Sequence, residues 1–327
     1  GVATVPVGPW GGSRGAAGAA PGNVSAGNAA HEVYVTAAPD QPATGVQILG
    51  SLLGTDASGS AAVVAGQEAV VVTGAVPGMQ VGAAGAGNVV VAGTEGEGGS
   101  RGGVFLVDLG PGGAPDGATV AGNLVGLNAA GSAPLGQVGT GIAVTTDVDN
   151  GGVENVTIGG DVGGGAGNRV AGVLGIVVEF PRSSGAVVEG NTVGLLASGA
   201  LARAEPDGIG LVILGANEGQ VVDNTIGGQA IGLALASDDS AVLGNRIGTD
   251  PAGGEARPNT VGVVVYGRGE GGLAVGDRNQ VGAAGAGNVI SGNENGGLRL
   301  GGVLEVGPAL TATAWARIRA KQGGDEA

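Results

Sequence analysis

Short stretches in which apolar and polar residues alternate recur along most of the chain, and all of them have a glycine within their first three residues. Alternation bounded by Gly, Asn, Asp or Pro is typical of a β-strand with two different faces. None of these stretches keeps the spacing of an amphipathic helix, and glycine inside a helix costs about 1 kcal/mol per position. The stretches are 103–108, 141–146, 174–180, 208–214, 230–236, 261–267 and 296–300. The pattern therefore predicts many short strands and little helix.

The alternation divides the strand residues into an inward set and an outward set. We expect the inward set to comprise Ile142, Val144, Ile176, Val178, Ile209, Leu211, Ile231, Leu233, Val263 and Val265. The outward set contains Tyr34, Phe105, Glu179, Tyr266 and Arg299, and the rest of it is mostly Val and Leu. A contiguous exposed apolar face usually marks a contact site. We therefore expect this outer face to contact another protein surface, a polysaccharide stacked on its rings, or an end segment of the chain.

A Gly-Asn phrase separates the strands and returns throughout the sequence. Gly and Asn readily adopt left-handed backbone angles, which a sharp corner requires. An asparagine amide can also hydrogen-bond to its counterpart in the turn above and below. We expect structural corners at Asn23, Asn88, Asn123, Asn168, Asn191, Asn224, Asn245 and Asn288, with Ser51 replacing the asparagine in one copy.

The spacing of these corners predicts a solenoid. Short strands that recur once per turn cannot bury an apolar side alone, so successive turns must stack, about 4.8 Å apart. The shorter intervals fit one coil of roughly 22 to 24 residues, and unmarked or enlarged coils would explain the longer intervals. About 13 coils would then form a rod on the order of 60 Å long.

The phrase VGAAGAGNV occurs at 81–89 and again at 281–289, and it raises the alternative of a phosphate-binding loop. A glycine-rich phosphate loop must follow a strand and open a helix, whose N-terminus holds the anion. Here each copy leads into another strand-like stretch. We therefore interpret the phrase as corner chemistry.

Composition narrows the class of protein. The chain has 327 residues and 76 glycines, but no Gly-X-Y period, which excludes collagen. Its hydrophobic content of 43% argues against disorder. The net charge of −15 would repel phosphate backbones, which makes a nucleic-acid partner improbable. The apolar runs are too short to span a bilayer. The chain has no cysteine, hence no thiolate metal site, and this fits a bacterial exported protein.

Taken together, the phrases NTIGG, GAGNVISGN and GNRIGTD resemble those of the right-handed parallel β-helix repeat proteins of the pectin-lyase-like superfamily. The resemblance is strongest to long arrays in bacterial exported or surface proteins. It implies an all-β, right-handed solenoid with three parallel sheets over residues 22–303. The segment 1–21 is then an irregular N-terminal segment or cap. The helix-like segment 304–327 is a C-terminal cap or linker.

Enzymes of this superfamily act on polysaccharides, but their motifs map poorly onto this chain. Polygalacturonase-like enzymes combine Asp-Asp with Gly-His-Gly and Arg-x-Lys. Here Asp238-Asp239 lies far from His31, the single histidine. The pectate-lyase arginine motif has no match, since Arg182 stands alone. We therefore assign no catalytic residue and expect Asp238 and Asp239 to be solvated turn residues.

Two other polar groups are candidate sites. Glu179 and Arg182 would form a patch with Glu205 and Asp207 if neighbouring coils bring them together. Glycoside hydrolysis needs two carboxylates roughly 5 to 9 Å apart. The stretch 145–155 supplies several hard oxygens, as calcium prefers, although it is not an EF-hand loop. Its candidate calcium ligands are Asp147, Asp149, Asn150 and Glu154.

The sequence leaves three functions open. We favour a non-catalytic structural or adhesin-like segment of an exported bacterial surface protein, which needs no cofactor. The second is a polysaccharide lyase or glycoside hydrolase that acts along the outer sheet. The third is a calcium-stabilised carbohydrate-binding module.

Overall fold

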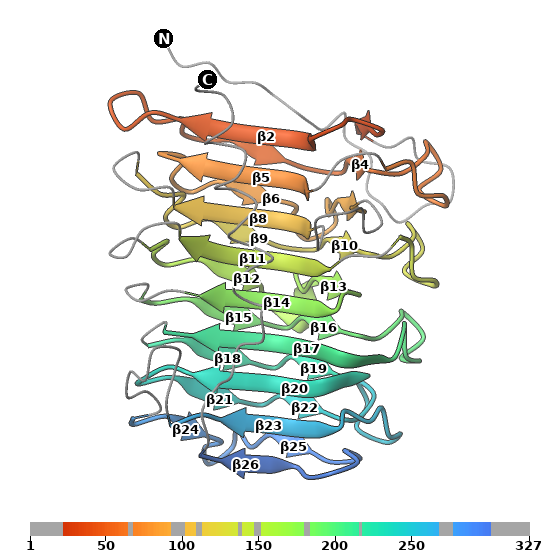
Figure 1. Cartoon of the computed structure of the whole chain (residues 1–327), viewed down its shortest axis with the longest axis vertical. Helices are drawn as coiled ribbons and strands as arrows, with labels where there is room; N and C mark the ends of the chain where they lie inside the picture. Colours follow the sequence, from red (N-terminus) through yellow and green to blue (C-terminus); the bar gives the residue numbers. More distant parts are fainter. Residues whose placement is uncertain are drawn as a thin grey trace, which may run out of the picture.

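The computed structural model of the chain describes residues 22–64, 68–92, 102–108, 113–136, 139–146, 152–179, 184–215, 218–267 and 277–301. Within them the chain winds as a right-handed parallel β-helix with three sheets, all of whose strands are parallel (Figure 1). The predicted fold class is therefore confirmed. The segments expected as caps, 1–21 and 304–327, lie outside the described residues.

Each coil from the second onward contributes one strand to each of three sheets, which we name A, B and C, whereas coil 1 contributes none to sheet A. Coil 1 holds β1 and β2, coil 2 holds β3 to β5, and so on to coil 9 with β24 to β26. Sheet A contains β3 (Gln47–Ile48), β6 (Gln80–Val81), β9 (Thr119–Val120), β12 (Thr157–Gly159), β15 (Val187–Glu189), β18 (Gln220–Val222), β21 (Ala241–Leu243) and β24 (Gln280–Val281). Sheet B contains β1 (Val24–Ser25), β4 (Leu52–Leu53), β7 (Val89–Val90), β10 (Leu124–Val125), β13 (Arg169–Val170), β16 (Thr192–Val193), β19 (Thr225–Ile226), β22 (Arg246–Ile247) and β25 (Val289–Ile290).

Sheet C has the longest strands and carries the outer face on which we expected contacts. It contains β2 (His31–Ala37), β5 (Glu68–Gly74), β8 (Gly102–Asp108), β11 (Thr140–Thr146), β14 (Leu174–Glu179), β17 (Glu205–Leu214), β20 (Gln229–Ala236), β23 (Val261–Val265) and β26 (Leu298–Leu300). One short 3-10 helix, η1 (Val162–Gly164), lies in the corner between β12 and β13.

The described residues form nine coils, so the expectation of about 13 was wrong. The longer intervals between corner asparagines are single coils with long loops. Asn123 and Asn168 are 45 residues apart, yet Leu124 pairs directly with Arg169 in the neighbouring strand. Nine coils at the usual spacing give a stack about 40 Å long.

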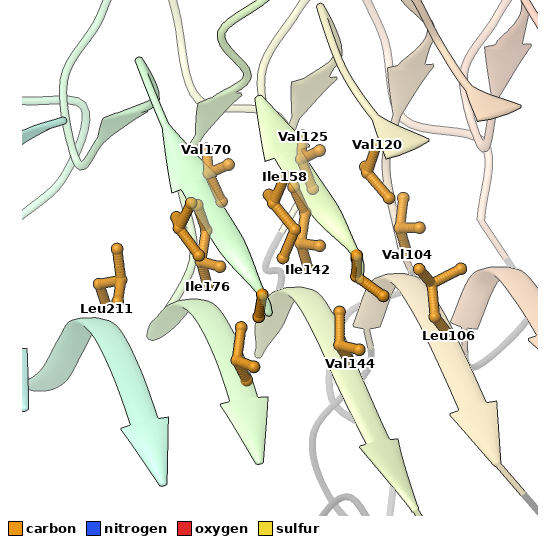
Figure 2. Close-up of a cluster of buried hydrophobic side chains, with 14 of the residues drawn as sticks. Val104, Leu106, Val120, Val125, Ile142, Val144, Ile158, Val170, Ile176 and Leu211 are labelled. Carbon is orange, nitrogen blue, oxygen red and sulfur yellow. The ribbon is translucent and has the colours of Figure 1, made fainter. Parts of the chain in front are cut away.

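The core is a column of small aliphatic side chains between the three sheets (Figure 2). A typical coil contributes one residue from sheet A, one from sheet B and two from sheet C, such as Val120, Val125, Ile142 and Val144 in coil 4. All four are fully buried. Complete burial of such a side chain contributes about 1.5–3 kcal/mol. Stacked Val and Ile residues therefore hold the coils together without large aromatic groups.

Glycines near the start of the sheet C strands allow the sheets to approach closely. A Cβ on Gly141 would overlap a methyl of Val170 in sheet B and press against the carbonyl oxygen of Gly175 in the next coil. The same holds at Gly175, whose neighbours are Val193 and Gly210. This explains why the alternating stretches carry a glycine near their start.

One detail of the predicted inward set was wrong at these glycines. Ile209 contacts Val177, Val212 and Ala234 of the outer face, and Ile231 packs against the same cluster. The alternation of inward and outward residues therefore does not extend to the residue that precedes the glycine in these strands.

The corner asparagines form one hydrogen-bonded column along the stack. Each buried amide oxygen accepts the backbone N–H and the side-chain NH₂ of the asparagine in the preceding coil, as Asn168 does from Asn123, at 3.0 and 2.9 Å. Its own Nδ2 donates to a carbonyl of the preceding coil and to the next asparagine, here Val120 and Asn191. The column runs through Asn88, Asn123, Asn168, Asn191, Asn224, Asn245 and Asn288. Ser51 joins it through its backbone N–H, which donates to Asn88.

Long and short loops alternate from coil to coil. Coils 2, 4, 6 and 8 carry a hairpin between sheets B and C, closed by the bridges Thr55–Ala62, Leu127–Pro134, Leu195–Leu201 and Thr249–Ala256. We call these the side hairpins. The Ala129 N–H donates to the Gly59 carbonyl, and the Ala197 N–H donates to Gly131. Each of these bonds joins hairpins two coils apart, so the structural repeat is a pair of coils.

Candidate functional site

The five residues expected on a contact face belong to the outer side of sheet C or its immediate continuation. Tyr34, Phe105 and Arg299 fall in one row of paired positions that crosses all nine strands. Glu179 lies in the next row, paired with Leu214, and Tyr266 directly follows β23. The aromatic residues are nevertheless in coils 1, 3 and 8, so they do not form a continuous platform for sugar rings.

Most apolar side chains on this outer face are buried in the structure, and its role as a contact face stays a prediction. Phe105 is 5% exposed and contacts Val71, Val107 and Ala143. Its ring also lies against the backbone of Gly102. Row neighbours one coil apart flank each of these side chains along the sheet. Tyr34, at 53% exposure, remains open at the N-terminal end of the stack.

The structure separates the carboxylates proposed for hydrolysis. Glu179 ends β14 and pairs with Leu214, whereas Glu205 begins β17 and pairs with Gln229. The two side chains are therefore at opposite ends of the sheet C strands, at least 16 Å apart along the strand direction. Glu205 forms an ion pair with Arg203 at 3.7 Å, and Asp207 is exposed beside it. Arg182 lies outside the described residues. Glu179 and Glu205 do not form the pair that glycoside hydrolysis requires.

Asp238 and Asp239 take part in coil-to-coil bonding at the corner that precedes sheet A. Asp239 has a left-handed backbone with φ 54° and forms an ion pair with Arg278 in the next coil. Asp238 accepts the backbone N–H of Asp277 at 2.9 Å. Hydrogen bonding to Arg278 lowers the pKa of Asp239. Both aspartates thus bond their own corner to the equivalent corner of the next coil.

The candidate calcium loop is only partly described. Asp147, Asp149 and Asn150 lie outside the described residues, and Glu154 is exposed. The Glu154 N–H donates to Asp116 at 2.8 Å, and the Gly152 N–H donates to Asp108 at the same distance. Loss of hydration, followed by the nearby charges of Glu154 and Asp108, raises the pKa of Asp116. Within the described part of the chain, no three His, Cys, Asp or Glu residues are grouped as metal ligands.

Arginines that bind the side hairpins were not found from the sequence. Arg169 points outward from sheet B and donates to the carbonyl of Leu196 at 2.8 Å. Arg203 donates to the Gly136 carbonyl, and Arg257 donates to that of Gly199. Burial lowers the pKa of Arg169. The side hairpins themselves could have been recognised from the sequence, because the related phrases GTDASG, GLNAAG and GTDPAG occur in coils 2, 4 and 8.

The aspartates of the side hairpins predict how stability depends on pH. Asp250 accepts the N–H groups of Gly254 and Glu255 at 2.8 and 2.9 Å, and the bond from Glu255 is the main cause of its lowered pKa. A lowered pKa contributes stability that is complete above the ordinary value of 3.8 and is lost as pH falls through the folded-state value. Asn128 holds the same place in its hairpin and cannot titrate. We expect Asp250→Asn to flatten the fall of Tm between about pH 5 and 2.

Asp116→Asn provides the opposite sign as a control. Its raised pKa means that the folded state favours the protonated carboxyl. The contribution of Asp116 to the stability of the fold is therefore lost as pH rises through the folded-state pKa. The substitution should therefore improve Tm at neutral pH relative to acidic pH. Thermal unfolding followed by circular dichroism across the pH series measures both effects. Identical pH profiles for the wild type and Asp250→Asn would contradict the assignment.

Comparison with known proteins leaves the fold as the main guide to function. No protein family, curated protein or solved structure matches the chain. Across the described ranges, the structure contains no helix with the length and apolar character needed to cross a membrane.

Proposed function

We propose that the protein is a non-catalytic, rigid β-helix segment of an exported bacterial surface protein, where it acts as a spacer. The observation that carries this proposal is the asparagine column, because it joins coils 3 to 9 through side-chain amides that are buried in every coil except the last. We further propose that the chain belongs to the right-handed parallel β-helices of the pectin-lyase-like superfamily. The absence of cysteine and the net charge of −15 are compatible with export and with solubility at high local density.

The arrangement of polar side chains supports a spacer better than an enzyme. The buried asparagines bond to neighbouring coils, Arg169 and Arg257 bond to side-hairpin carbonyls, and Arg203 bonds to the Gly136 carbonyl just after a side hairpin. Glu179 and Glu205 are held at opposite ends of sheet C. These polar groups therefore maintain the regular stack, and the geometry favours a rod of fixed length.

A deletion of two coils tests the rod. Removing residues 123–190 joins Gly122 to Asn191, which restores a Gly-Asn corner and retains the alternation of side hairpins. Cysteines at Ala57 and Ala252, which are both exposed in side hairpins, allow spin labels to be attached to this cysteine-free chain. We expect a narrow distance distribution near 29 Å along the axis, shortened by about 10 Å in the deletion. A broad distribution would show that the stack is too flexible for a spacer.

A deletion of one coil is the matched control. Removing residues 123–167 also restores a Gly-Asn corner, but it places the hairpins of coils 2 and 6 three coils apart. The direct bonds between hairpins cannot then form, so this variant should have the lower Tm of the two. Export is tested by labelling intact producing cells with an impermeant reagent, and an entirely unlabelled chain contradicts it. Release of unsaturated or new reducing ends from acidic polysaccharides would contradict the non-catalytic assignment.

A further inference from the structure

The two ends of the described stack expose large apolar side chains that its middle buries. Val24 and Tyr34 in coil 1 are 47% and 53% exposed. Val289, Leu298 and Leu300 in coil 9 are 42%, 46% and 71% exposed. Unpaired strand edges with apolar side chains are templates for another chain. The ends therefore combine exposed apolar side chains with unpaired strand edges, which suits them to a protein contact.

The repeated nonapeptide indicates what fits on coil 9. In coil 3, a Cβ on Gly87 would overlap the carbonyl oxygen of Gly122, which shows how tightly coil 4 sits on that glycine. At Gly287, in the second copy of the same nine residues, no described atom lies within 4 Å of such a Cβ. Coil 9 thus leaves open the surface that, in coil 3, is covered by the Gly-Asn corner of the following coil.

Coil 1 begins with a matching Gly-Asn pair. The backbone N–H and Nδ2 of Asn88 donate to Asn123, which follows Gly122. Asn288 is the last member of the column, and its N–H occupies the position equivalent to that of Asn88. Gly22 and Asn23 repeat the pair Gly122–Asn123. The donors at one end of the stack therefore correspond to acceptors at the other.

The rows of sheets B and C also match from end to end. Val33, Tyr34 and Val35 open the rows that Leu298, Arg299 and Leu300 close. Continuation of these rows would pack Leu298 on Val33 and Leu300 on Val35. It would place the Arg299 guanidinium over the Tyr34 ring, which is a favourable cation–π contact. In sheet B, Val289 would meet Val24 in a single row.

We propose that the protein associates head to tail with a second copy of itself, with coil 9 of one copy stacked on coil 1 of the next. Because the two surfaces differ, the contact does not close on itself, and repeated addition builds a filament with continuous parallel sheets. This inference goes beyond the proposed spacer and does not depend on export.

Disulfide trapping tests the register. The chain has no cysteine, so Val24→Cys and Val289→Cys can be made separately, one with a size tag. Adjacent strands place Cα atoms about 4.8 Å apart, within the range that a disulfide spans. After mixing and mild oxidation of the full chains, we expect the mixed disulfide to exceed the half share of random pairing. A random distribution, or protein that stays monomeric because other segments cover the ends, overturns the proposal.

A glycine substitution tests the surface itself. Gly287→Ala, added to Val289→Cys, meets no described atom in the monomer but should overlap the Gly22 carbonyl in the stack. We expect an unchanged Tm and loss of the excess of mixed disulfide. Gly254→Ala also has no neighbour within 4 Å and lies in a side hairpin, so it should retain the excess. Equal trapping in the two variants overturns the proposed register.

Discussion

Gly87→Ala is expected to lower Tm by several degrees, whereas Gly287→Ala should leave it nearly unchanged. Both glycines occupy the same position in identical nonapeptides, so their local backbone preferences are the same. A methyl group on Gly87 would overlap the Gly122 carbonyl, whereas Gly287 has no described neighbour within 4 Å. Overpacking of this kind typically costs about 1–3 kcal/mol, and more when the opposing atom is backbone that cannot move aside. Thermal unfolding under conditions that keep the protein monomeric measures the difference.

A terminal coil can also tolerate substitution because it frays, so a control within coil 9 is needed. Gly292 has φ 75° and a Cβ there would lie 2.6 Å from the Gly248 carbonyl. Gly292→Ala should therefore release coil 9, which hydrogen exchange of β25 and β26 would detect. Equal losses of Tm for Gly87→Ala and Gly287→Ala would show that the phrase acts through local conformation and not through stacking.

The corners of this fold were predictable because glycine marks a sharp turn in the sequence itself. Gly122, Gly190 and Gly244, which precede corner positions, have left-handed backbones with φ of 68°, 66° and 67°. Among the described residues no corner asparagine has a positive φ, so that part of the expectation was wrong, and these side chains act through bonds between coils. The number of coils was not predictable in the same way. The interval from Asn123 to Asn168 is filled by a side hairpin and other loops, and nothing local distinguishes a long loop from a missed turn. The recurrence of hairpin phrases in alternate coils was the signal that would have corrected the count.

The geometry of the candidate sites depends on strand register and on spatial neighbours, and the alternation of apolar and polar residues reveals neither. Whether Glu179 and Glu205 meet depends on the ends of the strands that they occupy, which only the pairing register establishes. Whether Phe105 is exposed depends on neighbours that are remote in sequence, such as Val71 and Ala143. A second, shorter column of Gln229, Asn259 and Asn293 was missed, because Gln229 and Asn259 lack the Gly-Asn phrase and only Asn293, which follows Gly292, carries it.

Asn168→Ala should be among the most destabilising single substitutions in the protein. Asn168 is 1% exposed, and its amide accepts two bonds from Asn123 and donates to Val120 and Asn191. Alanine leaves two donors of Asn123 and the Val120 carbonyl buried without their partner. Each unsatisfied buried group costs about 1–3 kcal/mol, so a total loss of roughly 3–5 kcal/mol is expected. Chemical denaturation, with hydrogen exchange of coils 4 to 6, measures this loss.

The substitution Asn168→Asp separates the loss of the amide group from the loss of side-chain volume. Asn168→Asp preserves the shape but removes both donors and buries a carboxylate against the Val120 carbonyl. Its folded-state pKa should be raised, so this variant should regain stability as pH falls and the carboxyl is protonated.

Ser51→Asn tests the column by extending it at its N-terminal end. The Ser51 N–H already donates to Asn88 at 2.9 Å, and Asn23 lies 3.5 Å from its hydroxyl. An added amide should stabilise the fold by about 1 kcal/mol. If Asn168→Ala and Ser51→Asn both left the unfolding free energy unchanged, the column would not be what holds the coils in register, and the rigidity attributed to the rod would have to come from the aliphatic core alone.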